Sequence, residues 1–195
     1  MEYVLAPKSR KIIPYATWTG AFNAEQLDTM QHIAFSSQTP AQVGGAGGQG
    51  VIENGIRRSN ISWVFNHQET MWIFKILGDV AAELNADYFG FDLDGFGEGL
   101  QFTNYDHSHQ GMYGWHQDFG GKGISRKLSL VLQLSDPSQY EGGNLEILVT
   151  GNPTVIPKER GLITAFPAWT LHQVTPVTAG NRQSLVAWVS GKNFK

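Results

Sequence analysis

The sequence predicts an α+β protein in which helices come first and an antiparallel jelly roll follows. Two segments with helical spacing of apolar residues lie in the first 90 residues, and short β-rich runs separated by Gly, Pro, Asn and Asp follow. A chain of 195 residues that is 41% hydrophobic can bury a core without cross-links. We expect one domain over residues 1–195, with helical support and substrate loops over about 1–90 and the jelly-roll core over about 90–195.

Two helices are predicted ahead of the strands. The first runs from about residue 24 to 34 behind Asn23 as its cap. The second is expected to start after Asn66, because Glu69 three residues on resembles a capping box. Its apolar stripe is broad, so one face should pack on a sheet. The stripe consists of Met71, Phe74, Leu77, Val80, Ala81 and Leu84.

The second half of the chain is expected to form strands punctuated by turn residues. The predicted strands are residues 100–105, 128–134, 145–149, 161–166, 171–174 and 184–189. A glycine-rich run over residues 44–50 lacks the Gly-Lys-Ser/Thr ending of a phosphate-binding loop, and we interpret it as a mobile loop near the mouth of the site.

Composition excludes several classes of site. The chain has no cysteine, which rules out disulfides, thiolate zinc sites and cysteine nucleophiles and fits a cytoplasmic location. A net charge of −3, with no long run of one sign, predicts no nucleic-acid partner. No window approaches 18 apolar residues, so no membrane span is expected, and the N-terminus lacks the apolar stretch of a signal peptide.

Three residues have the pattern of a metal site with open coordination positions. His116 and Asp118 are two apart, so on a strand their side chains point to one face. His172 can supply a third ligand from a neighbouring strand. Two histidines and one carboxylate leave three positions vacant, which iron(II) needs to bind a co-substrate and O2 together. A His-x-Asp alone is weak evidence, and the later histidine strengthens it.

A single arginine stands where a dicarboxylate could be held beside that metal. Arg182 opens the apolar run Leu185–Val189, and a charge there is costly unless it is paired. A guanidinium suits bidentate pairing with the far carboxylate of 2-oxoglutarate. Ser184 shares its face and can add a hydrogen bond. A surface arginine at the start of a strand is the alternative.

With these motifs in order, the chain resembles the prolyl 4-hydroxylase-like branch of the 2-oxoglutarate/iron(II)-dependent dioxygenase superfamily. The resemblance covers roughly the last ninety residues. Its matching segments are residues 105–118, 127–135, 140–145, 166–177 and 180–188, and Arg57-Arg58-Ser59 with Trp63 is similar to an upstream stretch.

The resemblance implies a double-stranded β-helix, that is, a jelly-roll core with flanking N-terminal helices. It implies that His116, Asp118 and His172 bind iron and that Arg182 anchors 2-oxoglutarate. Tyr105 is the tyrosine expected to hydrogen-bond this co-substrate, and Tyr113 is its competitor because Tyr105 lies slightly further from His116 than is usual. The other expected co-substrate contacts are Ser129, Gln133 and Ser184, and the expected substrate-pocket residues are Trp188 and Arg57.

The resemblance also implies an activity. We expect hydroxylation of prolyl residues, or of a related peptide or amino acid, coupled to decarboxylation of 2-oxoglutarate with Fe(II), O2 and L-ascorbate. Arg182 replaces the Lys of animal collagen-type enzymes, which favours bacterial, viral-like or oxygen-sensing members, and Asp118 favours hydroxylation over halogenation. Two alternatives stay open: a non-catalytic jelly-roll module that binds metal or ligand, and a cupin-like metalloenzyme that does not use 2-oxoglutarate.

Overall fold

The computed structural model describes residues 13–35, 38–43, 51–119 and 125–192. The predicted mobile loop over residues 44–50 lies outside these ranges. Within them, no helix is long and apolar enough to cross a membrane.

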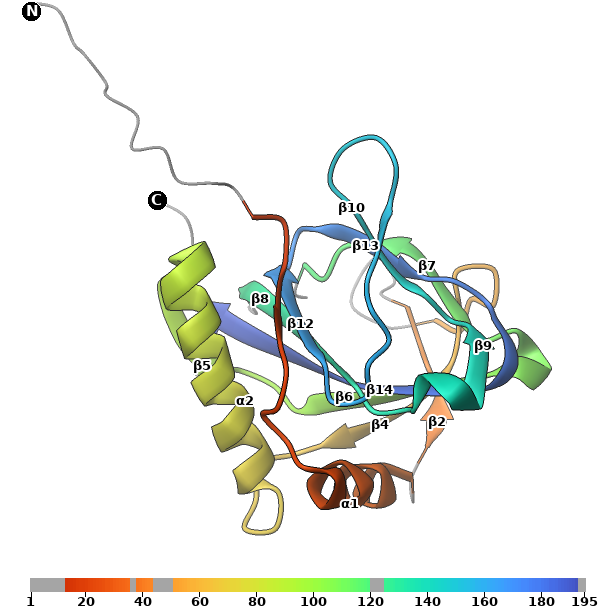
Figure 1. Cartoon of the computed structure of the whole chain (residues 1–195), viewed down its shortest axis with the longest axis horizontal. Coiled ribbons are helices and arrows are strands. Elements are labelled where there is room, and N and C mark those ends of the chain that lie inside the picture. Colours follow the sequence, from red (N-terminus) through yellow and green to blue (C-terminus); the bar gives the residue numbers. More distant parts are fainter. Residues whose placement is uncertain (1–12, 36–37, 44–50, 120–124, 193–195) are drawn as a thin grey trace, which may run out of the picture.

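The described residues form two antiparallel sheets, as a jelly roll requires (Figure 1). The larger is nine-stranded, with the order β1-β12-β8-β14-β6-β4-β2 and with β5 and β9 both paired to β14. The smaller has the order β11-β10-β13-β7-β3. The larger sheet contains β1 (Ala16–Trp18), β2 (Thr39–Pro40), β4 (Asn60–Val64), β5 (Leu93–Phe96), β6 (Leu100–Asp106), β8 (Arg126–Gln133), β9 (Tyr140–Gly142), β12 (Ile163–Pro167) and β14 (Val177–Gly191). The smaller contains β3 (Arg57–Arg58), β7 (Met112–His116), β10 (Leu145–Leu148), β11 (Thr154–Val155) and β13 (Leu171–Val174).

Both helices flank the strands (Figure 1). They are α1 (Ala24–Phe35) and α2 (Met71–Leu84), and a π-helical turn, η1 (Asn85–Phe89), continues α2. Helix α2 presents its predicted apolar stripe to the larger sheet, where Phe74 meets Phe96 of β5 edge to face with ring centroids 5.6 Å apart. The exception is Met71, which is exposed. Two 3-10 turns, η2 (His107–His109) and η3 (Pro137–Gln139), complete the elements.

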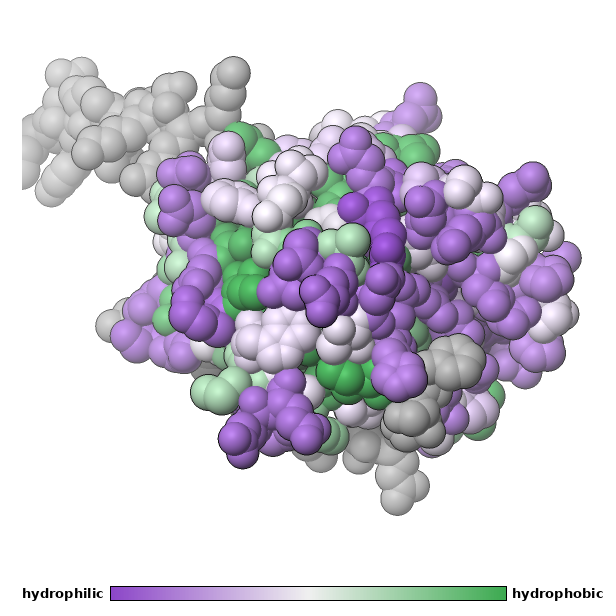
Figure 2. Space-filling model, turned by 60° about the horizontal axis from the view of Figure 1, so that its bottom comes forward, coloured by the Kyte–Doolittle hydropathy of each residue, from purple (hydrophilic) through white to green (hydrophobic). Residues whose placement is uncertain are grey.

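Along the central strands of the larger sheet, alternate side chains face the helical core and the space between the sheets. On β8, Leu128 and Leu130 face the helices, whereas Ser129 points into the space between the sheets, where it bonds Asp118. On β14, Leu185 packs in the helical core and Trp188 faces the other way. A second, smaller core lies between the sheets. The face seen in Figure 2 is mostly hydrophilic with interspersed hydrophobic areas, because most large apolar side chains are buried in the core.

Two predicted boundaries are wrong. Helix α2 begins at Met71 and not after Asn66, because the Thr70 hydroxyl accepts from the His67 amide at 3.1 Å and donates to the Phe65 carbonyl at 2.5 Å, which holds a turn there. Glu69 forms no capping box; its amide donates to His67. The last strand is far longer than residues 184–189, since β14 pairs along its length with β5, β6, β8 and β9.

Candidate metal centre

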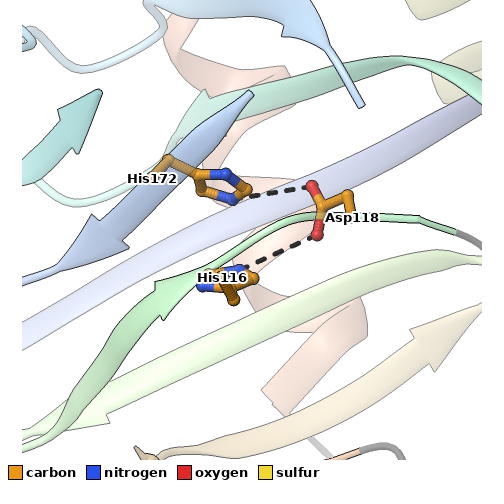
Figure 3. A group of neighbouring side chains, drawn as sticks. All are labelled: His116, Asp118 and His172. Atoms are coloured by element: carbon orange, nitrogen blue, oxygen red, sulfur yellow. Dashed lines mark ion pairs between the residues drawn. The ribbon is translucent and has the colours of Figure 1, made fainter. Parts of the chain in front are cut away.

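Three side chains from the smaller sheet and the segment after it converge on one point (Figure 3). His116 is the last residue of β7, and His172 lies opposite it on β13 in the antiparallel register. His116 Nε2 is 3.7 Å from Asp118 Oδ1, and His172 Nε2 is 3.6 Å from Asp118 Oδ2. The three ligand atoms lie within 4.8 Å of one another. This donor set fits a metal ion with open positions on its far side.

Asp118 reaches this point by a different route from the one predicted. It does not share a strand with His116, because β7 ends at His116. Its amide donates to the Ala168 carbonyl at 2.8 Å, which fixes the segment after β7 against the turn that precedes β13. The carboxylate is then buried, and the Ser129 hydroxyl donates to its Oδ2 at 2.8 Å.

Both imidazoles are held in the tautomer that a metal needs. His116 Nδ1 lies 2.8 Å from the Gly114 carbonyl, and His172 Nδ1 lies 2.9 Å from the Thr170 carbonyl. A carbonyl can only accept, so each Nδ1 carries the proton and each Nε2 keeps its lone pair directed at Asp118. Such an outer hydrogen bond also fixes the ring orientation.

Burial and neighbouring groups shift the pKa values of His116 and Asp118. Burial of His116, with the neighbouring His172, lowers its pKa from 6.5 to about 4, so this imidazole is neutral near neutral pH. Burial raises the pKa of Asp118, but His172, His116 and Ser129 outweigh it, and the pKa of the carboxyl ends below its ordinary value. Both shifts favour the unprotonated His116 nitrogen and the ionised Asp118 oxygen that can bind a cation.

A cavity of about 410 Å³ opens from these three ligands between the sheets. The predicted residues that line it are Arg57, Tyr105, Tyr113, Arg182, Ser184 and Trp188. Ser129 lies behind Asp118, and Gln133 lies in a small cavity on the other side of Arg182. A separate cavity of about 510 Å³ near Arg58 contains none of the three ligands.

Arg182 forms the inner wall of this cavity. It lies in the middle of β14 opposite Tyr105 and not at the start of a strand, and it is 2% exposed. Its Nη1 is buried without a hydrogen-bond partner, and among the described residues no carboxylate lies within ion-pair distance of it. A buried guanidinium with a free donor is costly unless a ligand completes it. An incoming carboxylate fits that requirement.

The two candidate tyrosines take different places. The Arg182 guanidinium carbon lies 5.5 Å from the Tyr105 ring centroid, so Tyr105 stands beside the anchor. Tyr113 stacks on His116, with ring centroids 3.5 Å apart and planes 15° apart, and the Arg57 guanidinium carbon lies 4.5 Å from the centroid of the Tyr113 ring. Burial raises the pKa of the Tyr113 phenol, which keeps it neutral.

Sequence reasoning missed residues that complete the cavity wall. Arg126 lies over the Trp188 ring at 3.7 Å and pairs with Glu98 through two 2.6 Å bonds. The signal was available, because Arg126 precedes a buried run as Arg182 does. Trp63, which the resemblance had included without a role, packs against Trp188 with ring centroids 6.1 Å apart. Gln101 accepts from Arg57 at 2.8 Å, and no local pattern marks it.

In sequence, known proteins resemble the chain mainly over the strands that carry the candidate site. Residues 100–190 match the model of the 2OG-Fe(II) oxygenase superfamily. The chain is 43% identical over 83 residues to a PKHD-type hydroxylase of Synechococcus sp., a match that covers 40% of this chain and 36% of that protein. A PKHD-type hydroxylase of Stenotrophomonas maltophilia is 37% identical over 95 residues, with 46% of this chain and 41% of that protein covered. The chain therefore matches less than half of the length of these curated relatives.

Solved structures share the fold over most of the chain. A prolyl-4-hydroxylase of Pseudomonas putida has a TM-score of 0.70 at 19% identity, with 92% of this chain and 94% of that chain covered. This likeness shows the fold, the expected double-stranded β-helix. The family match spans the positions of His116, Asp118, His172 and Arg182, and residues 100–190 of this chain are therefore similar to the 2OG-Fe(II) oxygenase superfamily.

Proposed function

We propose that this protein is a hydroxylase that uses Fe(II), O2 and 2-oxoglutarate. The observation that carries the proposal is the coincidence, in one cavity, of a His-Asp-His cluster and a buried arginine with a free donor. A metal site alone would fit many jelly-roll proteins. A guanidinium without a counter-ion beside it requires an anionic ligand as well.

The roles of the residues follow from their positions. His116, Asp118 and His172 hold the metal through Nε2 and carboxylate oxygens. Arg182, with Ser184 on the same face of β14, binds the far carboxylate of 2-oxoglutarate, and Tyr105 stands beside them. A metal held there would activate O2, which would oxidise 2-oxoglutarate to succinate and CO2 with one of its oxygen atoms and hydroxylate a C–H bond of the substrate with the other. The cavity walls orient the substrate and exclude water.

For the substrate we propose a prolyl residue of a peptide, with another peptide or amino-acid side chain as the broader class. Support comes from proteins with the same fold, among them a prolyl hydroxylase of Trichoplax adhaerens in complex with a peptide fragment of a hypoxia inducible factor, at a TM-score of 0.72, 15% identity and coverage of 91% of this chain and 84% of that chain. Trp188 and Arg57 are the proposed substrate contacts, since both line the cavity. L-Ascorbate is proposed as the reductant that keeps the iron in its Fe(II) state.

The test measures succinate release by the protein with Fe(II), ascorbate and 2-oxoglutarate over a panel of proline-containing peptides. We expect succinate, together with a product heavier by one oxygen atom in mass spectrometry. His172→Ala removes a ligand and should abolish both signals, whereas His32→Ala, which changes an exposed residue of α1, should leave them intact. Absence of succinate together with absence of iron-dependent 2-oxoglutarate binding would overturn the proposal.

A further inference from the structure

We propose that Lys158 is a second cation for the far carboxylate of 2-oxoglutarate, and that it makes the site select dicarboxylates over monocarboxylates. The inference rests on the proposed function, because 2-oxoglutarate is its ligand. It adds a residue that no sequence motif marks, since Lys158 lies in the segment between β11 and β12.

Lys158 and Arg182 meet at one small cavity although they come from different parts of the chain. Both line it, together with Gln133 and Thr164 of the larger sheet. Arg182 also lines the 410 Å³ cavity that holds the metal ligands. Arg182 therefore borders both the cavity of the proposed iron ligands and the small cavity that Lys158 lines. A carboxylate that binds Arg182 comes within the field of the ammonium group.

The lysine side chain is held in this position by two contacts. Its Nζ donates to the Gly142 carbonyl at 2.5 Å and lies 4.8 Å from the centroid of the Tyr140 ring. The turn that offers this carbonyl depends on glycine, because Gly142 and Gly143 have φ values of +70° and +58°. A Cβ on Gly143 would lie 3.0 Å from Arg182 Cδ, so a glycine also leaves room for the guanidinium.

Lys158 and Arg182 both lie near the Tyr140 phenol, and neither forms an ion pair with a described carboxylate. Tyr140 lies under Lys158, its hydroxyl accepts from Gln133 Nε2 at 3.1 Å, and the Arg182 guanidinium acts on the same phenol. Within the part of the chain that the structure describes, no carboxylate lies within ion-pair distance of Lys158 or Arg182. Burial lowers the pKa of Lys158, and the charge of Arg182 lowers it further. An incoming carboxylate relieves this repulsion, and that gain favours its binding.

A purely structural role is the competing account, in which Lys158 only ties its loop to Gly142. Two substitutions separate the accounts. Lys158→Gln keeps an N–H donor and removes the charge, whereas Lys158→Arg keeps the charge. Comparing two ligands also distinguishes the structural account from the ligand-binding account. The ligands are 2-oxoglutarate and 2-oxopentanoate, which has a methyl group in place of the far carboxylate. Dissociation constants are measured by calorimetry on the full chain loaded with Fe(II) under anaerobic conditions.

We expect Lys158→Gln to weaken 2-oxoglutarate binding by about three- to tenfold, a size typical of one partly screened charge, and to leave 2-oxopentanoate binding unchanged. Lys158→Arg should bind 2-oxoglutarate within about twofold of the unaltered protein. Lys75→Gln, on the exposed side of α2, is the matched control and should change neither constant. Equal weakening of both ligands, or no weakening of either, would overturn the inference.

Arg182→Ala separates this inference from the proposed function. If it leaves 2-oxoglutarate binding intact, then the proposed function itself is wrong. If it weakens binding strongly while Lys158→Gln does not, then only the role of Lys158 is wrong.

Discussion

At the scale of single residues, the three proposed metal ligands are positioned by groups outside the ligand set. Backbone carbonyls of Gly114 and Thr170 orient the two imidazoles, and the Ser129 hydroxyl holds Asp118. Partners of this kind set both the direction and the basicity of a ligand. The affinity for metal therefore depends on more than the His-Asp-His cluster.

Ser129→Ala tests this dependence. The hydroxyl that donates to Asp118 Oδ2 is lost while the strand and its packing stay, so we expect Fe(II) affinity to fall by about tenfold, at the lower end of what such partners contribute. Competition with a chelating dye under anaerobic conditions measures it. Ser138→Ala, an exposed position on η3, should leave the affinity unchanged, and an equal affinity in both variants would contradict the role of Ser129.

At the scale of elements, the helices stabilise the sheet that supports the site. Helix α2 covers the apolar face of β6, β8 and β14, and the opposite face of the same strands carries Tyr105, Ser129 and Arg182. One strand thus serves both the core and the site, since alternate side chains point to opposite faces. Stability and chemistry can be altered separately on such strands.

Leu77→Ala tests that separation. The side chain is 1% exposed in the core under α2, and its truncation should lower the free energy of unfolding by about 2–5 kcal/mol. Chemical denaturation measures the loss, and Fe(II) affinity below the transition should be unchanged. Lys75→Ala, two positions earlier on the exposed side, should change stability by less than about 0.5 kcal/mol. A Leu77→Ala protein that is fully stable, or folded but unable to bind Fe(II), would refute the separation.

At the scale of the whole molecule, we expect the site to destabilise the fold until a metal binds. It gathers two imidazoles, one carboxylate and an uncompensated guanidinium in the interior. A ligand that binds only the folded state stabilises it by about 2.7 kcal/mol at a hundredfold excess over its dissociation constant. We expect the melting temperature to rise with Fe(II) and further with 2-oxoglutarate, whereas Arg182→Ala should lose the second increment alone. Calorimetry checks both steps, and a second increment that survives in Arg182→Ala would contradict the anchor.

The metal-free protein should lose stability as the pH falls from 7 to 5. The pKa of His116 is about 4 when folded and 6.5 ordinarily, so between these values the unfolded chain binds a proton that the folded chain does not. Stability therefore decreases as pH falls, by on the order of 2 kcal/mol over this interval. Urea titrations at several pH values measure it. His116→Gln should flatten this part of the profile, and an unchanged slope in the variant would rule out His116 as the cause.

A large part of the site was already determined by the sequence. The residue types that can bind iron(II) and a dicarboxylate stand at His116, Asp118, His172 and Arg182, and the family match covers all four. The order of helices and strands was also readable, because apolar periodicity reports which face of an element is buried. The prediction of one domain over the whole chain stays a prediction. The assigned roles of the site residues also stay predictions, namely those of His116, Asp118, His172, Arg182, Tyr105, Tyr113, Ser129, Gln133, Ser184, Trp188 and Arg57.

Tertiary structure alone decided which of these groups meet. Antiparallel pairing places His172 against His116, and a backbone bond to Ala168 brings in Asp118 after its strand has ended. Tyr113 stacks on a metal ligand while Tyr105 stands beside Arg182, a difference that their spacing in the chain did not reveal. The position of Lys158 beside the Gly142 carbonyl follows no local pattern either. Local sequence determines the conformation and burial of each element, whereas a contact between distant segments depends on strand register and on the turns that set it.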